Sequence, residues 1–328
     1  MLTDRLPRIS LAHLPTPLEL LPRLSAALGG PQLWIKRDDQ TGLATGGNKA
    51  RKLEFLVAEA LAQGATTLIT AGAPQSNHAR QTAAAAAKCG LRAILVLGGG
   101  PPSQSRHGGN LLLDRLLGAE VRWAEGRDRA EVMAEVAEEE RAAGRRPYIV
   151  PYGGSNPVGA SGYVAALEEL ATQLAERSLQ VDHVVFATSS GGTQAGLCVA
   201  AKALRFPARI VGISVDKPAR ELQDRLAALA TDTAAHLGLN LRFTPEEFIV
   251  HDEYCSAGYG VVTEREREAI RLLAQTEGVL VDPVYTGRAL AGLIDLIRRG
   301  AFGQQERVCF WHTGGTAGLF AYGEALLR

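Results

Sequence analysis

The stretch Thr45-Gly46-Gly47-Asn48-Lys49-Ala50-Arg51-Lys52 lies where a glycine-rich turn leads into a helical pattern that runs to Ala62. Two glycines let the backbone approach a bulky group closely, and asparagine is a residue type that caps helices. Lys49 would then lie in the first helical turn, beside the positive end of the helix dipole and one turn from Lys52. Both neighbours disfavour its ammonium form. The stretch therefore predicts a nucleophilic lysine, although an arbitrary sequence of this kind is more often a solvated helix start.

From Lys52 onward, strand and helix patterns alternate along the chain. Strands are predicted for the short apolar runs at 67–70, 92–97, 120–123, 147–151, 183–187, 209–215 and 307–311, and a further short strand at 32–39. A second series of units begins near Gly159. Such alternation implies mostly parallel sheets with helices on both faces. The sequence therefore predicts an α/β protein of two domains.

The composition narrows the classes of partner. The chain has 328 residues, with 35 basic and 35 acidic side chains, so its net charge gives no reason to expect nucleic acid or an anionic membrane as partner. Its four cysteines are widely spaced without a CxxC motif, so no metal site is predicted. The N-terminus has no continuous apolar stretch and no window is long enough to span a membrane. We expect a cytoplasmic protein that acts on small molecules.

A glycine-rich loop follows the predicted strand at 183–187 and precedes a helical pattern. Strand, glycine turn and helix start together form an anion cradle, because free N–H groups and the helix dipole point at one place. The residues expected to hold a phosphate are Ser189, Ser190, Gly191, Gly192 and Thr193. A dinucleotide site is the main alternative, since Asp216 ends the next strand at a suitable distance for a ribose. However, the glycine spacing misses the GxGxxG pattern, which favours a single phosphate monoester.

A second polar loop, which contains Ser76, Asn77 and His78, follows the predicted strand at 67–70. Ser76 or Asn77 would be an ordinary helix N-cap, and the same groups could hold a substrate carboxylate. Near the C-terminus, the segments at 281–287 and 311–316 place hydroxyl groups beside glycines after apolar, strand-like runs. Tyr259 lies between two glycines, which would leave its ring accessible. An activatable lysine, a phosphate cradle and a carboxylate cradle are together the requirements of pyridoxal phosphate chemistry.

Five motifs, in the same order, resemble those of the D-cysteine desulfhydrase and 1-aminocyclopropane-1-carboxylate (ACC) deaminase family of pyridoxal phosphate enzymes. They are Lys36-Arg37-Asp38-Asp39, Gly46-Gly47-Asn48-Lys49-Ala50-Arg51-Lys52, Gln75-Ser76-Asn77-His78-Ala79-Arg80-Gln81-Thr82, Asp282-Pro283-Val284-Tyr285-Thr286-Gly287 and His312-Thr313-Gly314-Gly315. The resemblance implies the two-domain fold type II (tryptophan synthase β-like) architecture. One domain is nested in the other, so residues 52–158 would form the smaller domain and residues 1–51 and 159–328 the larger, cofactor-binding domain. It also implies a homodimer.

The same resemblance implies roles for individual residues. Lys49 would form the Schiff base with the cofactor, and the loop at 189–193 would bind its phosphate. Asn77 would lie beside the ring hydroxyl, and Ser76 near the substrate carboxylate and α-proton. The remaining implied positions are Tyr259 and Tyr285 near the substrate and Thr286 and Thr313 near the pyridine nitrogen.

Two of these positions separate the members of the family. ACC deaminases have glutamate at the position of Thr286 and leucine at that of Thr313, whereas D-cysteine desulfhydrases have threonine at both, as here. We therefore expect β-elimination of sulfide from D-cysteine, giving pyruvate and ammonia, with Lys49 or Ser76 as the base. The alternatives are L-cysteate sulfo-lyase, ACC deaminase, a pyridoxal phosphate carrier without activity and, from another class, a nicotinamide-dependent oxidoreductase.

Overall fold

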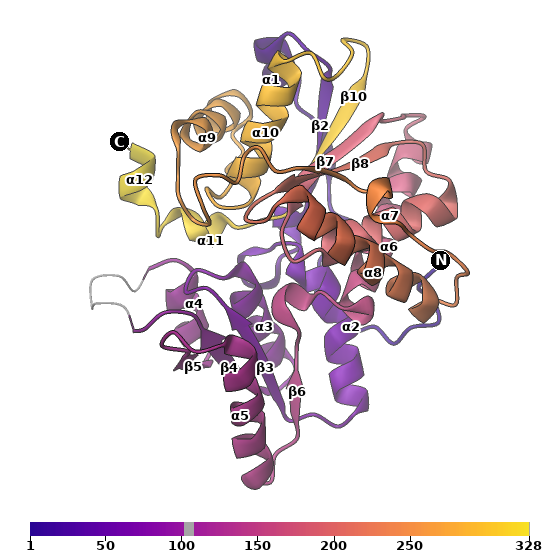
Figure 1. Cartoon of the computed structure of the whole chain (residues 1–328). Coiled ribbons are helices and arrows are strands. Elements are labelled where there is room, and N and C mark those ends of the chain that lie inside the picture. The colour runs from indigo at the N-terminus through magenta and orange to yellow at the C-terminus, as the bar shows by residue number, and fades with distance from the viewer. Residues whose placement is uncertain (102–107, 328) are drawn as a thin grey trace.

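Two sheets, each covered by helices, make up the chain in a computed structural model that describes residues 1–101 and 108–327 (Figure 1). The larger sheet has six strands, in the order β1 (Leu18–Leu20), β2 (Gln32–Arg37), β10 (Arg307–His312), β7 (His183–Thr188), β8 (Arg209–Ser214) and β9 (Ile249–His251). All neighbours are parallel except β1, which is antiparallel to β2. Because β2 and β10 pair directly, the first and last strands of the parallel part lie together in space.

The smaller sheet is wholly parallel. Its order is β5 (Glu120–Trp123), β4 (Arg92–Leu97), β3 (Thr67–Gly72) and β6 (Pro147–Ile149). Parallel neighbours need crossover connections, and the helices supply them. The helices that follow these strands or precede them are α2 (Lys49–Ala62), α3 (Asn77–Lys88), α4 (Asn110–Leu116) and α5 (Arg129–Ala142).

Helices cover both faces of the larger sheet. Its helices are α1 (Pro22–Leu28), α6 (Pro157–Glu176), α7 (Gly192–Leu204), α8 (Ala219–His236), α9 (Glu264–Glu277) and α10 (Thr286–Arg298), with the short α11 (Thr316–Leu319) and α12 (Gly323–Leu327) at the end. Successive side chains of a strand point to opposite faces, so Val184 and Phe186 pack with α6, α7 and α8 while Val185 packs with α9 and α10. Both faces are therefore apolar, as the continuous apolar strand sequences require.

The smaller sheet is also buried on both faces. Leu68 and Leu95 pack against α2 and α3, whereas Ile69 and Ile94 pack against α5. Helix α2 packs against α3 and also against α6, so it lies where the two sheets' helical layers meet (Figure 1). This position brings Lys49, the first residue of α2, between the two halves of the molecule.

The α/β architecture and most predicted elements are confirmed, two local expectations were wrong, and two short strands were missed. The apolar run at 279–281 is not a strand: it leads into α10, and its Leu280 carbonyl accepts a hydrogen bond from the His312 side chain. Asn48 lies at the N-cap of α2, but its side chain makes no capping hydrogen bond. Strands β1 and β9, each of three residues, were missed because so short a run carries no period.

The four strands of the smaller sheet all come from residues 67–149, and the six of the larger sheet come from residues 18–37 and 183–312. The exact boundaries of the two domains, near residues 52 and 158, stay a prediction. Among the described residues, no helix combines the length and apolar character that crossing a bilayer would need.

Candidate active site

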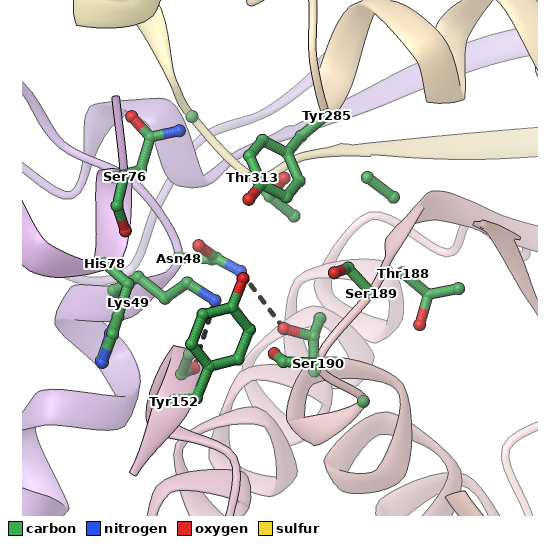
Figure 2. A pocket seen from close by; sticks show the side chains of 16 residues that line it. Asn48, Lys49, Ser76, His78, Tyr152, Thr188, Ser189, Ser190, Tyr285 and Thr313 are labelled. Atoms are coloured by element: carbon green, nitrogen blue, oxygen red, sulfur yellow. Dashed lines mark hydrogen bonds between the residues drawn. The ribbon is translucent and has the colours of Figure 1, made fainter. Parts of the chain in front are cut away.

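A pocket opens between the start of α2, the start of α3 and the loop that joins β7 to α7 (Figure 2). The space between these elements is about 640 Å³, a value that includes solvent at the open side of the pocket. Parallel strands point their carboxyl ends at this region, where α/β proteins commonly bind ligands. The lining residues are Asn48, Lys49, Ser76, Asn77, His78, Tyr152, Gly153, Ala187, Thr188, Ser189, Ser190, Gly191, Thr193, Tyr285, Thr313 and Gly314.

Lys49 points its amine into this pocket and shares a hydrogen-bond acceptor with Lys52. Its Nζ donates to the Gly153 carbonyl at 3.2 Å, and the Lys52 Nζ donates to the same oxygen at 3.1 Å. Burial lowers the pKa of Lys49 to about 8, while its interaction with Lys52 partly opposes that shift. Burial, and then the charge of Lys49, lowers the pKa of Lys52 well below its ordinary value. The predicted direction is therefore found, but its main cause is burial rather than the neighbouring charge.

The glycine turn before Lys49 is closely packed. A Cβ on Gly46 would lie 1.8 Å from the Asp39 carbonyl oxygen, and the positive φ of 75° also favours glycine. The Asn48 backbone N–H donates to the Thr313 carbonyl at 2.9 Å, and the Asn48 side chain donates to Thr193 Oγ1 at 3.2 Å. Asn48 therefore joins α2 to the start of α7 instead of capping its own helix (Figure 2).

The loop between β7 and α7 has the geometry expected of an anion cradle, and its binding of a phosphate stays a prediction. Gly191 has a φ of +94° at the N-cap of α7, and the first-turn N–H groups of that helix have no partner within it. Ser189, Ser190 and Thr193 line the pocket with Gly191. Gly192 lies just behind them, where a Cβ would come within 2.7 Å of Ser155 Oγ and 2.9 Å of Lys52 Nζ. The loop therefore has N–H groups, hydroxyls and an amine around one point.

Lys52 and Ser155 are parts of this cradle that the sequence did not reveal as such. Ser155 Oγ accepts from the Gly192 N–H at 3.1 Å and lies 2.8 Å from Ser190 Oγ. The Lys52 Nζ lies 3.3 Å from Ser155 Oγ. Only the fold brings the segment after β6 against the β7 loop, so spacing in the sequence could not show this contact.

The loop before α3 presents the second polar group of the pocket. Ser76 is the N-cap of α3, and its Oγ accepts from the Ala79 N–H at 3.2 Å, which leaves its own proton available. Asn77 and His78 also line the pocket. The His78 Nε2 lies 2.9 Å from Thr70 Oγ1, which itself donates to the Val150 carbonyl, so Nε2 is the protonated nitrogen. Burial lowers the pKa of His78 well below its ordinary value, so the ring is neutral.

Three tyrosines lie at or next to the pocket. Tyr285 lines it, and the Tyr259 hydroxyl lies 2.8 Å from the Tyr285 hydroxyl with the two rings edge to face. Tyr259 itself is 38% exposed and does not line the pocket. Tyr152, which no sequence motif marked, lines the pocket near Lys49 (Figure 2). The Arg129 guanidinium packs over its ring. Burial raises the pKa of each hydroxyl, so all three keep their protons at neutral pH.

The two threonines that the resemblance placed together differ in exposure to the pocket. Thr313 lines it. Thr286 is fully buried outside the lining, and its hydroxyl contacts Asp282 Oδ1 at 2.7 Å. Asp282 also accepts from the backbone N–H groups of Val284, Tyr285 and Thr286, so it fixes the start of α10 and the position of Tyr285.

These residues fit a phosphate-bearing aldehyde cofactor. The buried Thr188 Oγ1 lies in the pocket lining and has no hydrogen-bond partner among the described residues, as expected of a group that meets a ligand. The amine of Lys49 is poised to react with an aldehyde, and the α7 cradle suits a phosphate. No cluster of metal-ligating side chains occurs in the described part of the chain.

Comparison with known proteins decides which family these features represent. A family described as pyridoxal-phosphate dependent enzyme matches residues 9–314. The chain belongs to this family. Pyridoxal phosphate is therefore its cofactor, as predicted, and the alternative of a nicotinamide dinucleotide is not supported.

Individual relatives of this pyridoxal phosphate enzyme cover nearly the whole chain. It is 46% identical to the D-cysteine desulfhydrase of Klebsiella pneumoniae (strain 342) over 97% of both chains. It is 44% identical to a putative ACC deaminase of Pyrococcus abyssi (strain GE5 / Orsay), over 100% of this chain and 97% of the relative. The predicted membership of the D-cysteine desulfhydrase and ACC deaminase family is thus confirmed.

Solved structures confirm the fold type II architecture. A crystal structure of an ACC deaminase homologue matches with a TM-score of 0.90 and 42% identity, over 99% of this chain and 97% of that one. A crystal structure of O-ureido-L-serine synthase matches with a TM-score of 0.64 at 19% identity, over 94% of this chain and 92% of that one, which is a likeness of fold alone.

Proposed function

We propose that this enzyme is a carbon–sulfur lyase that eliminates sulfide from D-cysteine to give pyruvate and ammonia. The observation that carries the proposal is the absence of any acidic side chain among the residues that line the described pocket. A carboxylate beside the pyridine nitrogen would keep the ring protonated and strengthen it as an electron sink. Thiolate is a good leaving group and tolerates a weaker sink, whereas opening the unactivated ring of ACC does not. The 46% identity to a D-cysteine desulfhydrase supports the same choice.

Each pocket residue has a proposed role. Pyridoxal phosphate, held on a lysine in the resting enzyme, would accept the substrate amine in place of that lysine and withdraw electrons from the substrate's α-carbon. In our proposal Lys49 is that lysine, and Ser189 to Thr193 hold the phosphate with Lys52 and Ser155. Asn77 lies beside the ring hydroxyl. Ser76 and His78 face the substrate, with the free Ser76 proton donated to its carboxylate.

The proposal assigns α-proton removal to Lys49 rather than to Ser76. The pKa of Lys49 is about 8, so about a tenth of this amine is unprotonated at pH 7, far more than for a lysine with an ordinary pKa. Ser76 has no comparable help, because its oxygen accepts from the Ala79 N–H and the neutral His78 directs its protonated nitrogen to Thr70. Tyr285, which lines the pocket and keeps its proton, would contact the departing sulfur, with the Tyr259 hydroxyl hydrogen-bonded behind it.

A comparison of substrates tests the reaction. Pyruvate release should be measured from D-cysteine, L-cysteine and L-cysteate, and 2-oxobutanoate release from ACC, under saturating cofactor. We expect D-cysteine to be much the best substrate and ACC to give little product. Preference for L-cysteate would make the enzyme a sulfo-lyase, and ACC turnover comparable to that of D-cysteine would contradict the argument from the pocket. Absence of product from every compound would favour a carrier without activity.

A labelling experiment tests the assignment of Lys49. Borohydride reduction of the loaded protein, followed by peptide mapping, should place the pyridoxyl group on Lys49. A label on Lys52 or Lys36 would overturn the assignment. Lys52 is the sharper competitor because both amines contact the Gly153 carbonyl.

We also propose a cytoplasmic homodimer. In this proposal the partner subunit covers Leu116 and Phe320, two apolar side chains that are more than 70% exposed. Light scattering at several protein concentrations tests the assembly, and a monomer throughout would contradict it.

A further inference from the structure

Asn77, the pocket residue proposed to lie beside the ring hydroxyl, has its side-chain oxygen fully engaged on the side away from the pocket. Its Oδ1 accepts from Arg80 Nη1 at 3.0 Å and from Asn110 Nδ2 at 2.9 Å. An amide side chain has one oxygen and one NH2 group, so holding the oxygen fixes where the NH2 group points. The Asn77 side chain therefore has only N–H donors left to offer to the pocket.

Arg80 sets the orientation of both amides, because a guanidinium can only donate. Arg80 Nη1 also donates to Asn110 Oδ1 at 2.6 Å. The Asn110 amide must then direct its Nδ2 away from Arg80, toward the Gln75 carbonyl at 2.9 Å and toward Asn77. A second arm, Arg80 Nη2, donates to the Gly46 carbonyl at 2.7 Å. One side chain thus connects the glycine turn before Lys49 to the amide of Asn77.

The charge of Arg80 is opposed by two buried carboxyls, those of Asp114 and Asp282. Arg80 and Asp114 are both fully buried, and neither oxygen of Asp114 has a hydrogen-bond partner among the described residues. Burial raises the pKa of Asp114 to about 7, with the charge of Arg80 opposing the shift, so this carboxyl offsets only part of the arginine's charge. Burial lowers the pKa of Arg80 to about 10, which still leaves it a cation. A cation behind an amide oxygen polarises the amide and strengthens its N–H groups as donors.

We infer that Arg80, together with Asn110, is a positioning residue that holds the Asn77 NH2 group toward the cofactor's ring hydroxyl and so favours its anionic form. The inference rests on the proposed place of Asn77 beside that hydroxyl. Arg80 would touch neither cofactor nor substrate, and it would act only through the side-chain amide of Asn77. The cluster would thereby lower the pKa of the bound cofactor, because a donated hydrogen bond stabilises the deprotonated oxygen.

A double-mutant cycle that follows the absorbance of the bound cofactor against pH tests the inference. Asn77→Ala should raise the pKa of the bound cofactor by about one to two units, the equivalent of one hydrogen bond to a charged group. Arg80→Lys keeps a positive charge, but its single nitrogen cannot span Asn77, Asn110 and Gly46, so it should cause a similar rise. In the Asn77→Ala background, Arg80→Lys should cause no further rise. Asn110→Ala removes one of the two donors to Asn77 and should give a smaller rise.

The outcomes separate this inference from the proposal beneath it. An unchanged pKa in Asn77→Ala would mean that Asn77 does not meet the ring hydroxyl, and the proposed place of Asn77 would fail. A rise in Asn77→Ala without one in Arg80→Lys or Asn110→Ala would overturn the positioning role. A rise from Arg80→Lys that persists in the Asn77→Ala background would also overturn it, because Arg80 would then act through the Gly46 turn. Binding of inorganic phosphate to the cofactor-free variants, expected to stay unchanged, checks that the rest of the pocket is intact.

Discussion

Replacing Lys52 by methionine would remove the charge at the phosphate cradle and keep most of the side-chain volume. The Lys52 Nζ lies 3.3 Å from Ser155 Oγ, and a carbon added to Gly192 would come within 2.9 Å of it. In the free site, burial and the charge of Lys49 lower the pKa of Lys52 well below its ordinary value. A phosphate dianion at the start of α7 would reverse this, because a nearby opposite charge favours the ammonium form. Phosphate binding and protonation of Lys52 should therefore be coupled.

The size of the effect follows from the contact. A hydrogen bond to a charged group contributes about 1.5–3 kcal/mol, which corresponds to a factor of about 10 to 100 in affinity. The Lys52→Met variant should bind inorganic phosphate more weakly by that factor. Binding raises the pKa of Lys52, so at a pH between its values in the free and occupied sites the unmodified protein should take up a proton when phosphate binds. In this pH range the affinity for phosphate should fall as the pH rises.

Calorimetric titration of the cofactor-free protein with inorganic phosphate, in two buffers of different ionisation enthalpy, measures both quantities. Inorganic phosphate avoids the proton changes of Schiff base formation, and work above about pH 8 keeps it a dianion. Lys202→Met is the matched control, since Lys202 lies in the last turn of α7 and contacts Glu247. Equal affinity and equal proton uptake in Lys52→Met and the unmodified protein would refute the reasoning.

Gly192→Leu should weaken cofactor binding by about 10- to 100-fold, because the Cβ of the new side chain would lie 2.7 Å from Ser155 Oγ. Unchanged affinity in a folded variant would mean that the phosphate binds elsewhere. The rate of pyridoxal phosphate capture by the cofactor-free protein should rise with pH around a midpoint near 8, the pKa of Lys49, and a stopped-flow midpoint above 10 would contradict this. Asp38→Asn should lower the free energy of unfolding in urea by about 3–5 kcal/mol, because it breaks the buried pair with Arg51, and a loss below about 1 kcal/mol would count against it. Burial alone would raise the pKa of Asp38, but Arg51 holds it below its ordinary value, so this stability is present above the unfolded pKa of about 4 and disappears as the pH falls through the folded pKa.

The parts of this site that the sequence predicts are those in which chemistry and local structure coincide. Lys49 follows two glycines at a helix start, and Gly191 follows a strand and precedes a helix, so short-range rules are enough to mark both. The strands were predictable because a parallel strand buried on both faces is an unbroken apolar run.

The parts that the sequence could not show depend on contacts between distant segments. Tyr152 and Ser155 follow β6, and only the fold brings them to the pocket. Arg51 likewise forms buried ion pairs with both Asp38 and Glu169, and Glu169, in α6, is more than a hundred residues away in the sequence. The apolar run at 279–281 shows the opposite error. Its residues favour a strand, but a strand also needs a neighbour, and here the carbonyl of Leu280 accepts from a histidine instead.

The hydrogen bonds of Thr286 sharpen the argument about the reaction. A threonine hydroxyl has one proton. The Thr286 oxygen accepts from the Asp282 N–H at 2.9 Å, and its proton faces Asp282 Oδ1 at 2.7 Å, with the Gly314 carbonyl more distant at 3.3 Å. Thr286 therefore has no proton free for another acceptor, so in our proposal the pocket-lining Thr313 would be the hydroxyl beside the pyridine nitrogen. In our proposal a single neutral donor would leave the nitrogen unprotonated, and the departure of sulfide, rather than a stronger electron sink, would allow the α-proton to be removed.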